Sequence, residues 1–375
     1  MVVIKVETLI KNISSLGINT FAGVPDSTLK ELCNYLNSDN SDIIHYTLPN
    51  EGSAVGIATG VYLATGKPAC VYMQNSGIGN AVNPLTSITH ADVYNIPILF
   101  VIGYRGAPDF ADEPQHKFMG KITEKLLDCL DIKYAIIDCD IDEPELEDIF
   151  SRAKKFLSEN KQFALLIKEN TFGTEINISY DNDFVLNREE VLAGIIRNLD
   201  DNDIIVSTTG KVSREVYELC NKILGHHDQC FFVIGGMGHA SMIAFGIAVN
   251  RPGKRVICFD GDGAVLMHMG NPVFIAKQNI KNLIHICLNN DAHESVGGMP
   301  TAAGGFSYAD MAEACGYASS RKVQTPEELT DFLGDLLNIR ESTFVEVMVE
   351  NNSRASLGRP KETPEENLKR FMDLI

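Results

Sequence analysis

The sequence predicts an α/β fold made of two doubly wound parallel-sheet domains. Short runs of apolar, often β-branched residues alternate with helical patterns along nearly the whole chain. Within these runs the apolar residues are continuous, which is typical of parallel strands buried on both faces of a sheet. The 375 residues also exceed what a single hydrophobic core usually organises, so we expect two domains.

The first half contains six apolar runs that are expected to be strands, with helical patterns between them. A helical pattern over about 5–16 precedes the first strand, and a helix rich in small residues is expected from Glu51 to about Thr65. A polar loop is expected at about 104–116. The strands are expected at 19–23, 43–48, 69–73, 98–102, 134–137 and 163–167.

The periodic pattern stops after about residue 170 and then resumes. Polar and turn-forming residues dominate this stretch, so we expect a linker there. The predicted boundaries are a first domain at 1–170, a linker at 171–187 and a second domain at 188–375 that ends in a polar tail. Five further strands are expected at 204–207, 230–234, 256–259, 283–288 and 344–349, and a last helix around 365–374.

Charge and cysteine content restrict the possible partners and location. With 32 basic and 50 acidic residues the net charge is −18, which disfavours binding to nucleic acid or to an anionic membrane. An anionic ligand would therefore need local compensation from a metal ion, a helix N-terminus or a few cations. The nine cysteines are irregularly spaced and form no C-x-x-C pair, which favours a reducing cytoplasm. We expect no signal peptide and no membrane-spanning segment.

Oxygen-bearing side chains follow two consecutive predicted strands in the second half. Gly261-Asp262-Gly263 comes after the strand at 256–259, and Asn289-Asn290 ends the next one. Ligands of such sheets bind beyond the carboxyl ends of the strands. Carboxylate and amide oxygens suit Mg²⁺ or Ca²⁺ rather than Zn²⁺, and the glycines allow the backbone to approach a diphosphate. The alternative interpretation is a tight turn and an asparagine cap.

This pair of motifs resembles the diphosphate–metal signature of the thiamine diphosphate enzymes. The resemblance implies the thiamine diphosphate-binding fold, with a pyrimidine-type domain followed by a diphosphate-type domain. It also implies that Asp262, Asn290 and the main-chain oxygen of Ala292 bind Mg²⁺. Asn289 remains an alternative to Asn290, because the spacing is about one residue longer than in some members. Contacts to the cofactor are expected from Gly261, Gly263, Ala264 and Asn290.

Two other loops of the second domain fit the same resemblance. Met237 is similar to the apolar residue that wedges beneath the cofactor in this family, with Gly235 and Met237 as backbone contacts. The turn Thr209-Gly210-Lys211 resembles another cofactor contact, in which the lysine would offset diphosphate charge. The alternatives are a buried core methionine and a solvated lysine.

In the first domain, Glu51 stands where a predicted strand gives way to a helix. The resemblance implies that Glu51 is the catalytic acid that hydrogen-bonds the aminopyrimidine ring nitrogen and drives its imino tautomer. A proton is retained near neutral pH only if the carboxyl group is desolvated, which raises its pKa. A glutamate in a first helical turn can also serve only the helix dipole. In this family the acid serves the cofactor of a partner chain, which implies at least a homodimer.

Two domains without an insertion resemble the phosphonopyruvate and sulfopyruvate decarboxylases. Five segments carry this resemblance: 23–27, 75–80, 103–106, 112–116 and 295–301. It implies decarboxylation of 3-phosphonopyruvate to phosphonoacetaldehyde and CO₂, in 2-aminoethylphosphonate biosynthesis. The first alternative is sulfopyruvate or another 2-oxo acid, and the second is a non-catalytic regulatory or assembly subunit.

Four residues of the first domain are expected to contact this substrate. Asp26 and His116 are candidate catalytic proton donors or acceptors, whereas Arg105 and Asn75 could hold the phosphonate or the carboxylate. The alternatives are a helix N-cap for Asp26, a solvated loop residue for His116 and an exposed loop arginine for Arg105.

Overall fold

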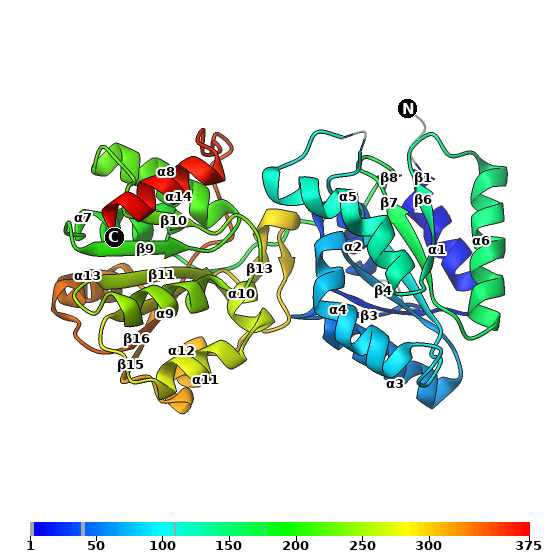
Figure 1. Cartoon of the computed structure of the whole chain (residues 1–375), viewed down its shortest axis with the longest axis horizontal. Helices are drawn as coiled ribbons and strands as arrows, with labels where there is room; N and C mark the ends of the chain where they lie inside the picture. Colours follow the sequence, from blue (N-terminus) through cyan, green and yellow to red (C-terminus); the bar gives the residue numbers. More distant parts are fainter. Residues whose placement is uncertain (1–3, 39–41, 109, 177) are drawn as a thin grey trace. The chain divides into compact units, whose positions relative to one another are not determined.

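The computed structural model describes residues 4–38, 42–108, 110–176 and 178–375 (Figure 1). The chain divides into two compact units, Met1–Ser179 and Tyr180–Ile375. Residues 1–3 of the predicted first domain, residue 109 of the predicted polar loop and residue 177 of the predicted linker lie outside the described residues.

A parallel sheet of six strands, in the order β3-β2-β4-β5-β7-β6, forms the centre of the first unit. Helices α3, α4 and α5 contribute to the core on one face, while α1 and α6 lie on the other (Figure 1). The strands are β2 (Thr20–Gly23), β3 (Ile44–Thr47), β4 (Ala69–Gln74), β5 (Ile98–Gly103), β6 (Lys133–Ile137) and β7 (Phe163–Ile167). The helices and helical turns are α1 (Val6–Ser15), η1 (Ser27–Leu29), α2 (Lys30–Leu36), α3 (Glu51–Thr65), η2 (Asn75–Gly77), α4 (Ile78–Pro84), η3 (Leu85–Thr89), α5 (Pro114–Cys129) and α6 (Glu143–Ser158).

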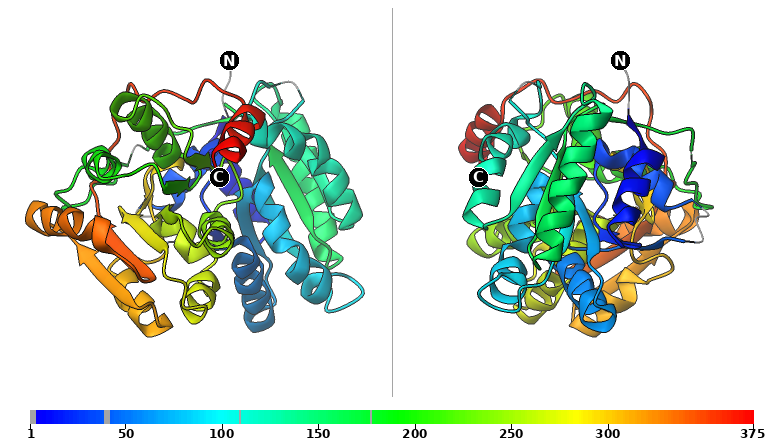
Figure 2. Two further views of the ribbon diagram at one scale, coloured as in Figure 1. Left: turned by 60° about the vertical axis from the view of Figure 1, so that its left-hand side comes forward. Right: turned by 90° about the vertical axis from the view of Figure 1, so that its right-hand side faces the viewer.

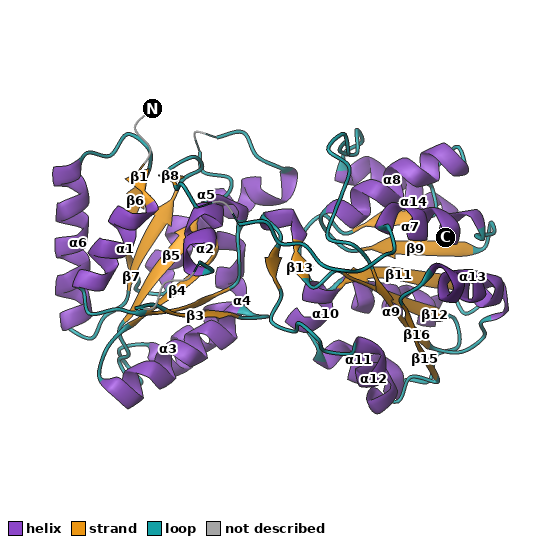
Figure 3. Cartoon of the chain, turned by 180° about the vertical axis from the view of Figure 1, so that it is seen from behind, coloured by secondary structure: helices purple, strands orange, loops and turns teal. Residues whose placement is uncertain are grey.

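The second unit has a six-stranded parallel sheet in the order β10-β9-β11-β12-β16-β15, with helices on both faces (Figure 3). Its strands are β9 (Asp203–Ser207), β10 (Cys230–Phe232), β11 (Arg255–Gly261), β12 (Leu283–Asn289), β15 (Ser319–Val323) and β16 (Thr343–Met348). An antiparallel hairpin joins β13 (Ala292–His293) to β14 (Met299–Pro300), with the turn η4 (Glu294–Val296) between them. The helices are α7 (Arg188–Arg197), α8 (Lys211–Ile223), α9 (Ala240–Asn250), α10 (Asp262–Met267), α11 (Gly270–Lys277), α12 (Tyr308–Cys315), α13 (Pro326–Asp335), η5 (Leu336–Asn338) and α14 (Pro364–Leu374).

Both sheets have the same topology, which confirms the predicted fold class (Figure 2 shows both from two further directions). If the six strands of each sheet are numbered 1 to 6 along the chain, their order across the sheet is 2-1-3-4-6-5 in both units. The chain reverses direction across the sheet between β2 and β4 in the first unit, and between β9 and β11 in the second. Doubly wound sheets bind their ligands at the carboxyl ends of the strands at such a reversal.

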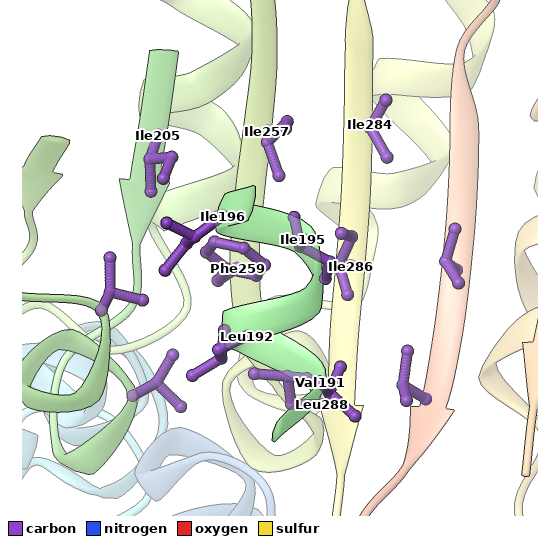
Figure 4. Packing of buried hydrophobic residues seen from close by; sticks show 14 of the residues in the cluster. Val191, Leu192, Ile195, Ile196, Ile205, Ile257, Phe259, Ile284, Ile286 and Leu288 are labelled. Carbon is purple, nitrogen blue, oxygen red and sulfur yellow. The ribbon is translucent and has the colours of Figure 1, made fainter. Parts of the chain in front are cut away.

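The core of the second unit shows why α7 forms where it does. One face of this helix carries two adjacent pairs of apolar residues, Val191-Leu192 and Ile195-Ile196. The second pair follows the first by four residues, about one helical turn, and all four side chains are buried. Burial of each such side chain contributes about 1.5–3 kcal/mol to folding. The sheet residues packed against this face are Ile205, Ile257, Phe259, Ile284, Ile286 and Leu288 (Figure 4).

Several elements differ from the sequence predictions, among them the hairpin strands β13 and β14, which were not predicted. β15 was not predicted, because four polar residues precede its one buried residue, Val323, at the edge of the sheet. The predicted linker contains β8 (Phe172–Gly173), which pairs with β1 (Ile4–Lys5). The loop predicted to reach residue 116 ends earlier, since α5 begins at Pro114, whose fixed φ suits a first helical turn. His116 is therefore a helical residue, and its prediction as a loop residue was wrong.

Two properties bear on the surroundings of the chain. None of the helices formed by the described residues combines the length and the apolar character needed to cross a bilayer. All nine cysteines are free, and six of them are buried.

A buried ion pair joins the amino ends of β9 and β11 in the second sheet, and we predict that it contributes strongly to stability. Asp203 is 1% exposed and accepts hydrogen bonds from Arg255 Nε (2.7 Å) and Nη2. Asp203→Asn leaves the guanidinium uncompensated, so the free energy of unfolding, measured by urea denaturation, should fall by about 3–5 kcal/mol. Asp335→Asn removes an exposed pair with Arg321 (3.0 Å) and should cost less than about 1 kcal/mol. Equal losses would contradict this prediction.

Candidate active site

Asp262 begins α10 directly at the end of β11 and is only 3% exposed. Its Oδ2 accepts a hydrogen bond from the Thr301 hydroxyl (3.0 Å), and its carbonyl oxygen accepts one from the Tyr308 hydroxyl (3.2 Å). Burial raises the pKa of Asp262 to about 7, which the Thr301 hydrogen bond opposes only in part. A divalent cation beside this carboxylate would favour the charged form, so the site is suited to one.

The two asparagines at the end of β12 use their amides alike but lie in different surroundings. Asn289 is wholly buried; its Nδ2 donates to Glu346 Oε1 (2.9 Å), and its Oδ1 accepts from the Asp291 N–H (3.0 Å). Asn290 lies beyond the strand; its Nδ2 donates to Glu294 Oε2 (3.2 Å), and its Oδ1 accepts from the Ala292 N–H (3.2 Å). Each amide oxygen retains a second lone pair. Because Asn289 is bonded to Glu346 of β16 within the sheet, whereas Asn290 lies in the loop after it, position rather than hydrogen bonding favours Asn290 as a metal ligand.

The three oxygens assigned to Mg²⁺ come from neighbouring loops of one sheet edge. Asp262 follows β11, and Asn290 and Ala292 follow β12, whose Leu288 pairs with Gly261. A carboxylate, an amide oxygen and a carbonyl oxygen are hard donors of the kind that Mg²⁺ prefers. The donor set therefore fits Mg²⁺ held against a diphosphate group.

Gly263 lies where three segments of the second unit meet. A Cβ atom at this position would be 3.2 Å from the Met237 methyl carbon and 3.2 Å from His293 Cε1. Met237 thus reaches the start of α10 from the loop after β10, and its side chain is only partly buried. Gly235 lies in the same loop and is also partly exposed. A partly exposed methionine that packs against a glycine at the start of α10 fits a cofactor wedge better than it fits a core methionine.

The turn between β9 and α8 contacts the segment after β13. Gly210 has φ +96°, and a Cβ atom there would lie 2.7 Å from Ser295 Oγ. The Thr209 hydroxyl donates to a carbonyl oxygen of the loop after β10 (2.9 Å). Lys211 Nζ is paired with Glu294 Oε1 (3.0 Å), so it is not the solvated lysine of the alternative interpretation.

Glu51 is the first residue of α3, in the first unit, and is 5% exposed. Asn50 caps the helix by accepting a hydrogen bond from the Gly52 N–H (2.8 Å), which fixes the direction in which α3 leaves the sheet. Burial raises the pKa of Glu51, and a hydrogen bond from Asn80 Nδ2 (2.7 Å) lowers it by less. A Cβ atom at Gly77 would lie 2.6 Å from Glu51 Cδ, so the carboxyl group needs a glycine there. These features agree with a carboxyl group whose pKa lies above that of an exposed glutamate.

Arg105 is held in place by its neighbours in the loop after β5. Its Nε and Nη2 donate to Asp112 (2.8 and 2.5 Å), and its Nη1 donates to Ser27 Oγ (2.8 Å). Asn75 is wholly buried and joins this loop to α5. Its Nδ2 donates to the Arg105 carbonyl oxygen (2.8 Å) and to Thr123 Oγ1 of α5 (2.9 Å). Arg105 is therefore not the exposed loop arginine of the alternative interpretation.

Asp26 and His116 lie near the same loop. Asp26 is wholly buried, caps η1 by accepting from the Thr28 N–H (3.0 Å), and accepts a second hydrogen bond from Gln74 Nε2 (2.6 Å). Burial raises the pKa of Asp26 despite these bonds. Burial and the positive charge of Arg105 lower the pKa of His116. The helix-cap alternative for Asp26 is thus present, and its raised pKa is compatible with a proton-carrying role as well.

Sequence reasoning found the residues at the strand ends but not the partners that orient them. Asn80 and Thr301 were quoted only as parts of the segments 75–80 and 295–301, and nothing in their spacing pointed to Glu51 or Asp262. Gln74 and Glu294 were missed altogether. In the sequence, these four residues are visible only as polar side chains close to a motif. Such a pattern does not reveal which catalytic or metal-binding side chain each of them contacts.

One more group of side chains outside the predicted site could hold a metal ion. Cys258, Asp260 and His285 are buried on β11 and β12, and their ligand atoms lie within 4.8 Å of one another. His285 Nε2 is 3.4 Å from Asp260 Oδ2, and the His285 ring packs edge-on against Phe344. This contact is compatible with a packing role for His285.

Comparisons with known proteins agree with this geometry. Two family models match, the thiamine pyrophosphate enzyme N-terminal TPP binding domain over residues 6–127 and the C-terminal TPP binding domain over 209–347. A phosphonopyruvate decarboxylase of Streptomyces viridochromogenes is 33% identical, over 98% of this chain and 94% of that protein. One of Streptomyces hygroscopicus is 31% identical, over 99% and 94%.

A sulfopyruvate decarboxylase of Methanosarcina acetivorans is 30% identical, over 98% of this chain and 97% of that protein. Among solved structures, a benzoylformate decarboxylase from Polynucleobacter necessarius matches 93% of this chain and 99% of that one, with 13% identity and a TM-score of 0.39, a likeness too weak to carry an argument. Both halves of the chain match one family, and relatives match it almost end to end. The chain therefore belongs to the thiamine pyrophosphate enzymes, in the group that contains the phosphonopyruvate and sulfopyruvate decarboxylases.

Proposed function

We propose that this chain is a thiamine diphosphate- and Mg²⁺-dependent decarboxylase that converts 3-phosphonopyruvate to phosphonoacetaldehyde and CO₂. The observation that carries the proposal is the presence, in one chain, of a buried Glu51 whose pKa is raised and of oxygen donors at the strand ends that bear Asp262 and Asn290. The choice of substrate is supported by the nearly full-length similarity to two phosphonopyruvate decarboxylases. Such a product suits 2-aminoethylphosphonate biosynthesis.

The second domain, at 188–375, would bind the diphosphate end of the cofactor. Asp262, Asn290 and the Ala292 carbonyl oxygen would hold Mg²⁺, and Met237 would support the cofactor from beneath. Thiamine diphosphate, when bound, stores the electron pair that the loss of CO₂ leaves beside a carbonyl group. Contacts to the cofactor would come from Thr209, Gly210, Lys211, Gly235, Met237, Gly261, Gly263, Ala264 and Asn290, with Gly235 and Met237 acting through their backbone groups.

The first domain, at 1–170, would supply the acid, and the linker at 171–187 would join it to the second. Because its pKa is raised, Glu51 keeps its proton to a higher pH than an exposed glutamate does. In the proposed function it would donate a hydrogen bond to the aminopyrimidine ring nitrogen.

The cluster around Arg105 would recognise the substrate. Asp112 and Ser27 fix the plane of the guanidinium group, so that it is preorganised for an oxyanion such as a phosphonate or a carboxylate. Asn75 would support this position from below, and Asp26 and His116 would handle the proton that replaces the lost carboxylate.

We infer that the active enzyme is at least a homodimer located in the cytoplasm. The apolar character of α3 and α9 extends around both helices, which is typical of helices covered on all sides. Yet Leu63 of α3 and Val249 of α9 are 73% and 43% exposed, and Val273 and Phe274 of α11 are exposed as well. A second copy would cover these side chains. The free cysteines support a reducing location.

An assay with three competing acids tests the substrate. Purified protein with thiamine diphosphate and Mg²⁺ should release CO₂ from phosphonopyruvate at the highest kcat/KM, compared with sulfopyruvate and pyruvate. Faster turnover of sulfopyruvate would establish the alternative that the Methanosarcina acetivorans relative favours. Binding of the cofactor with no CO₂ release from any acid would instead indicate a regulatory or assembly subunit.

Glu51→Gln should abolish proton transfer while leaving the fold intact. The carboxamide can occupy the same space but cannot act as the acid, so CO₂ release should fall by about 10²–10⁴-fold. Thiamine diphosphate affinity, measured by calorimetry, should change far less. The matched control is Glu143→Gln, which alters the exposed first residue of α6 and should leave activity unchanged. Retained activity of the Glu51 variant would refute its assigned role.

Gly77→Ala should reduce activity by displacing Glu51 without removing it. The added methyl group would lie 2.6 Å from Glu51 Cδ, so the carboxyl group must move, and a displaced catalytic group costs up to about 10²-fold in rate. Gly79→Ala, two residues further along, is the control, since a Cβ atom there meets nothing within 4 Å. Equal CO₂ release by the two variants would contradict the prediction.

A further inference from the structure

Glu294 connects three segments beside the proposed ion and diphosphate site. Its side chain is 9% exposed. Its Oε1 accepts a hydrogen bond from Lys211 Nζ (3.0 Å), and its Oε2 accepts from Arg188 Nη1 and from Asn290 Nδ2 (3.2 Å). Arg188 is itself fixed by two hydrogen bonds to Glu215 (2.7 and 2.6 Å). The carboxylate of Glu294 is therefore anchored from α7, and it contacts both the turn before α8 and the loop after β12.

Two contacts fix the direction of the Asn290 amide: the Ala292 N–H donates to its Oδ1 (3.2 Å), and its Nδ2 donates to Glu294 Oε2 (3.2 Å). A side-chain amide has one accepting end and one donating end, and the two are similar in size. A carboxylate can only accept, so it pairs with Nδ2 and leaves Oδ1 on the other side. Without that acceptor, only the Ala292 N–H would oppose a turn of the amide that brings its NH₂ group toward the cation, and an NH₂ group cannot ligate a metal ion. Glu294 thus reinforces the orientation in which Asn290 is a ligand.

The segment after β12 that carries Asn290 and Glu294 is called the ion loop below. The contact with Lys211 joins this loop to the turn Thr209-Gly210-Lys211, at whose end α8 begins. The same two segments also touch at Gly210, where a Cβ atom would lie 2.7 Å from Ser295 Oγ. An ion pair and a close backbone approach at neighbouring positions hold the two loops in one arrangement. Because both loops are expected to contact the diphosphate, their separation should match the distance that the cofactor spans.

We propose that Glu294 is a positioning residue that orients the Asn290 amide oxygen toward Mg²⁺ and couples the ion loop to the Lys211 turn. This inference rests on the proposed function, since it concerns the same cofactor. Groups that orient metal ligands from outside the coordination sphere typically change metal affinity by 10–100-fold when they are removed.

The first test compares Mg²⁺ binding by the wild type and by Glu294→Ala. Isothermal titration of Mg²⁺ into protein with thiamine diphosphate should give a Kd about 10–100-fold higher for the variant. Free Mn²⁺, followed by electron paramagnetic resonance, should show the same loss. At saturating Mg²⁺ much of the kcat should return, so the change appears in the KM for the metal. Glu294→Gln keeps the shape and one acceptor oxygen, and serves the comparison if the alanine variant does not fold.

Asp203→Asn is the matched control for general destabilisation. It also removes a buried carboxylate that is paired with an arginine in the second unit, but at the start of β9, the amino end of the sheet. It should lower the melting temperature and leave the Kd for Mg²⁺ within about twofold. An equal loss of affinity in this control, or no loss in Glu294→Ala, would overturn the proposal.

A second pair of variants separates orientation from charge. An aspartate presents an oxygen from either end, so Glu294→Ala should weaken Mg²⁺ binding by less than about threefold in the N290D background. A loss as large as in the wild-type background would refute the orienting role.

If the wild type binds cofactor and metal but decarboxylates no acid, the proposed reaction fails while these affinities still decide the role of Glu294. If it binds neither, both proposals fall.

Discussion

Two buried carboxyl groups with opposite requirements are the constraint on which this structure depends. Glu51 and Asp262 are both almost wholly buried, and burial raises the pKa of each. Glu51 can be accommodated by keeping its proton, although the amide donor of Asn80 favours the charged form. Asp262, which lies at the end of β11 and accepts a hydrogen bond from the Thr301 hydroxyl, can be accommodated by a divalent cation. In the proposed function one carboxyl group would serve as the acid and the other as the ligand, and burial is compatible with both roles.

The surrounding cations are already engaged within the protein. Arg188 and Lys211 are paired with Glu294, and Arg105 is paired with Asp112. In a chain of net charge −18, a bound diphosphate would therefore depend strongly on a metal ion and on backbone N–H groups for compensation. The paired side chains instead hold the loops in position, which reduces the reorganisation needed when a ligand binds.

The glycines at these strand ends are explained by close approach. Gly77 leaves room for the Glu51 carboxyl group, Gly263 for Met237 and His293, and Gly210 for Ser295. Each lies just beyond the carboxyl end of a strand in one of two sheets with the same strand order. In the proposed function the same topology would present an acid in one unit and metal ligands in the other, and the segments after the strands account for the difference.

The sequence by itself determined eleven of the twelve strands in the two six-stranded sheets, the start of α3 at Glu51 and the oxygen donors after β11 and β12, because apolar runs and strand-end motifs are local signals. It did not determine β15, whose polar residues pair only because β16 lies beside them. Nor could it reveal that Asn289 is held by Glu346, 57 positions beyond it. Likewise, Glu294 meets Arg188 across 106 positions. Such partners are set by sheet register and loop packing, which only the tertiary structure decides.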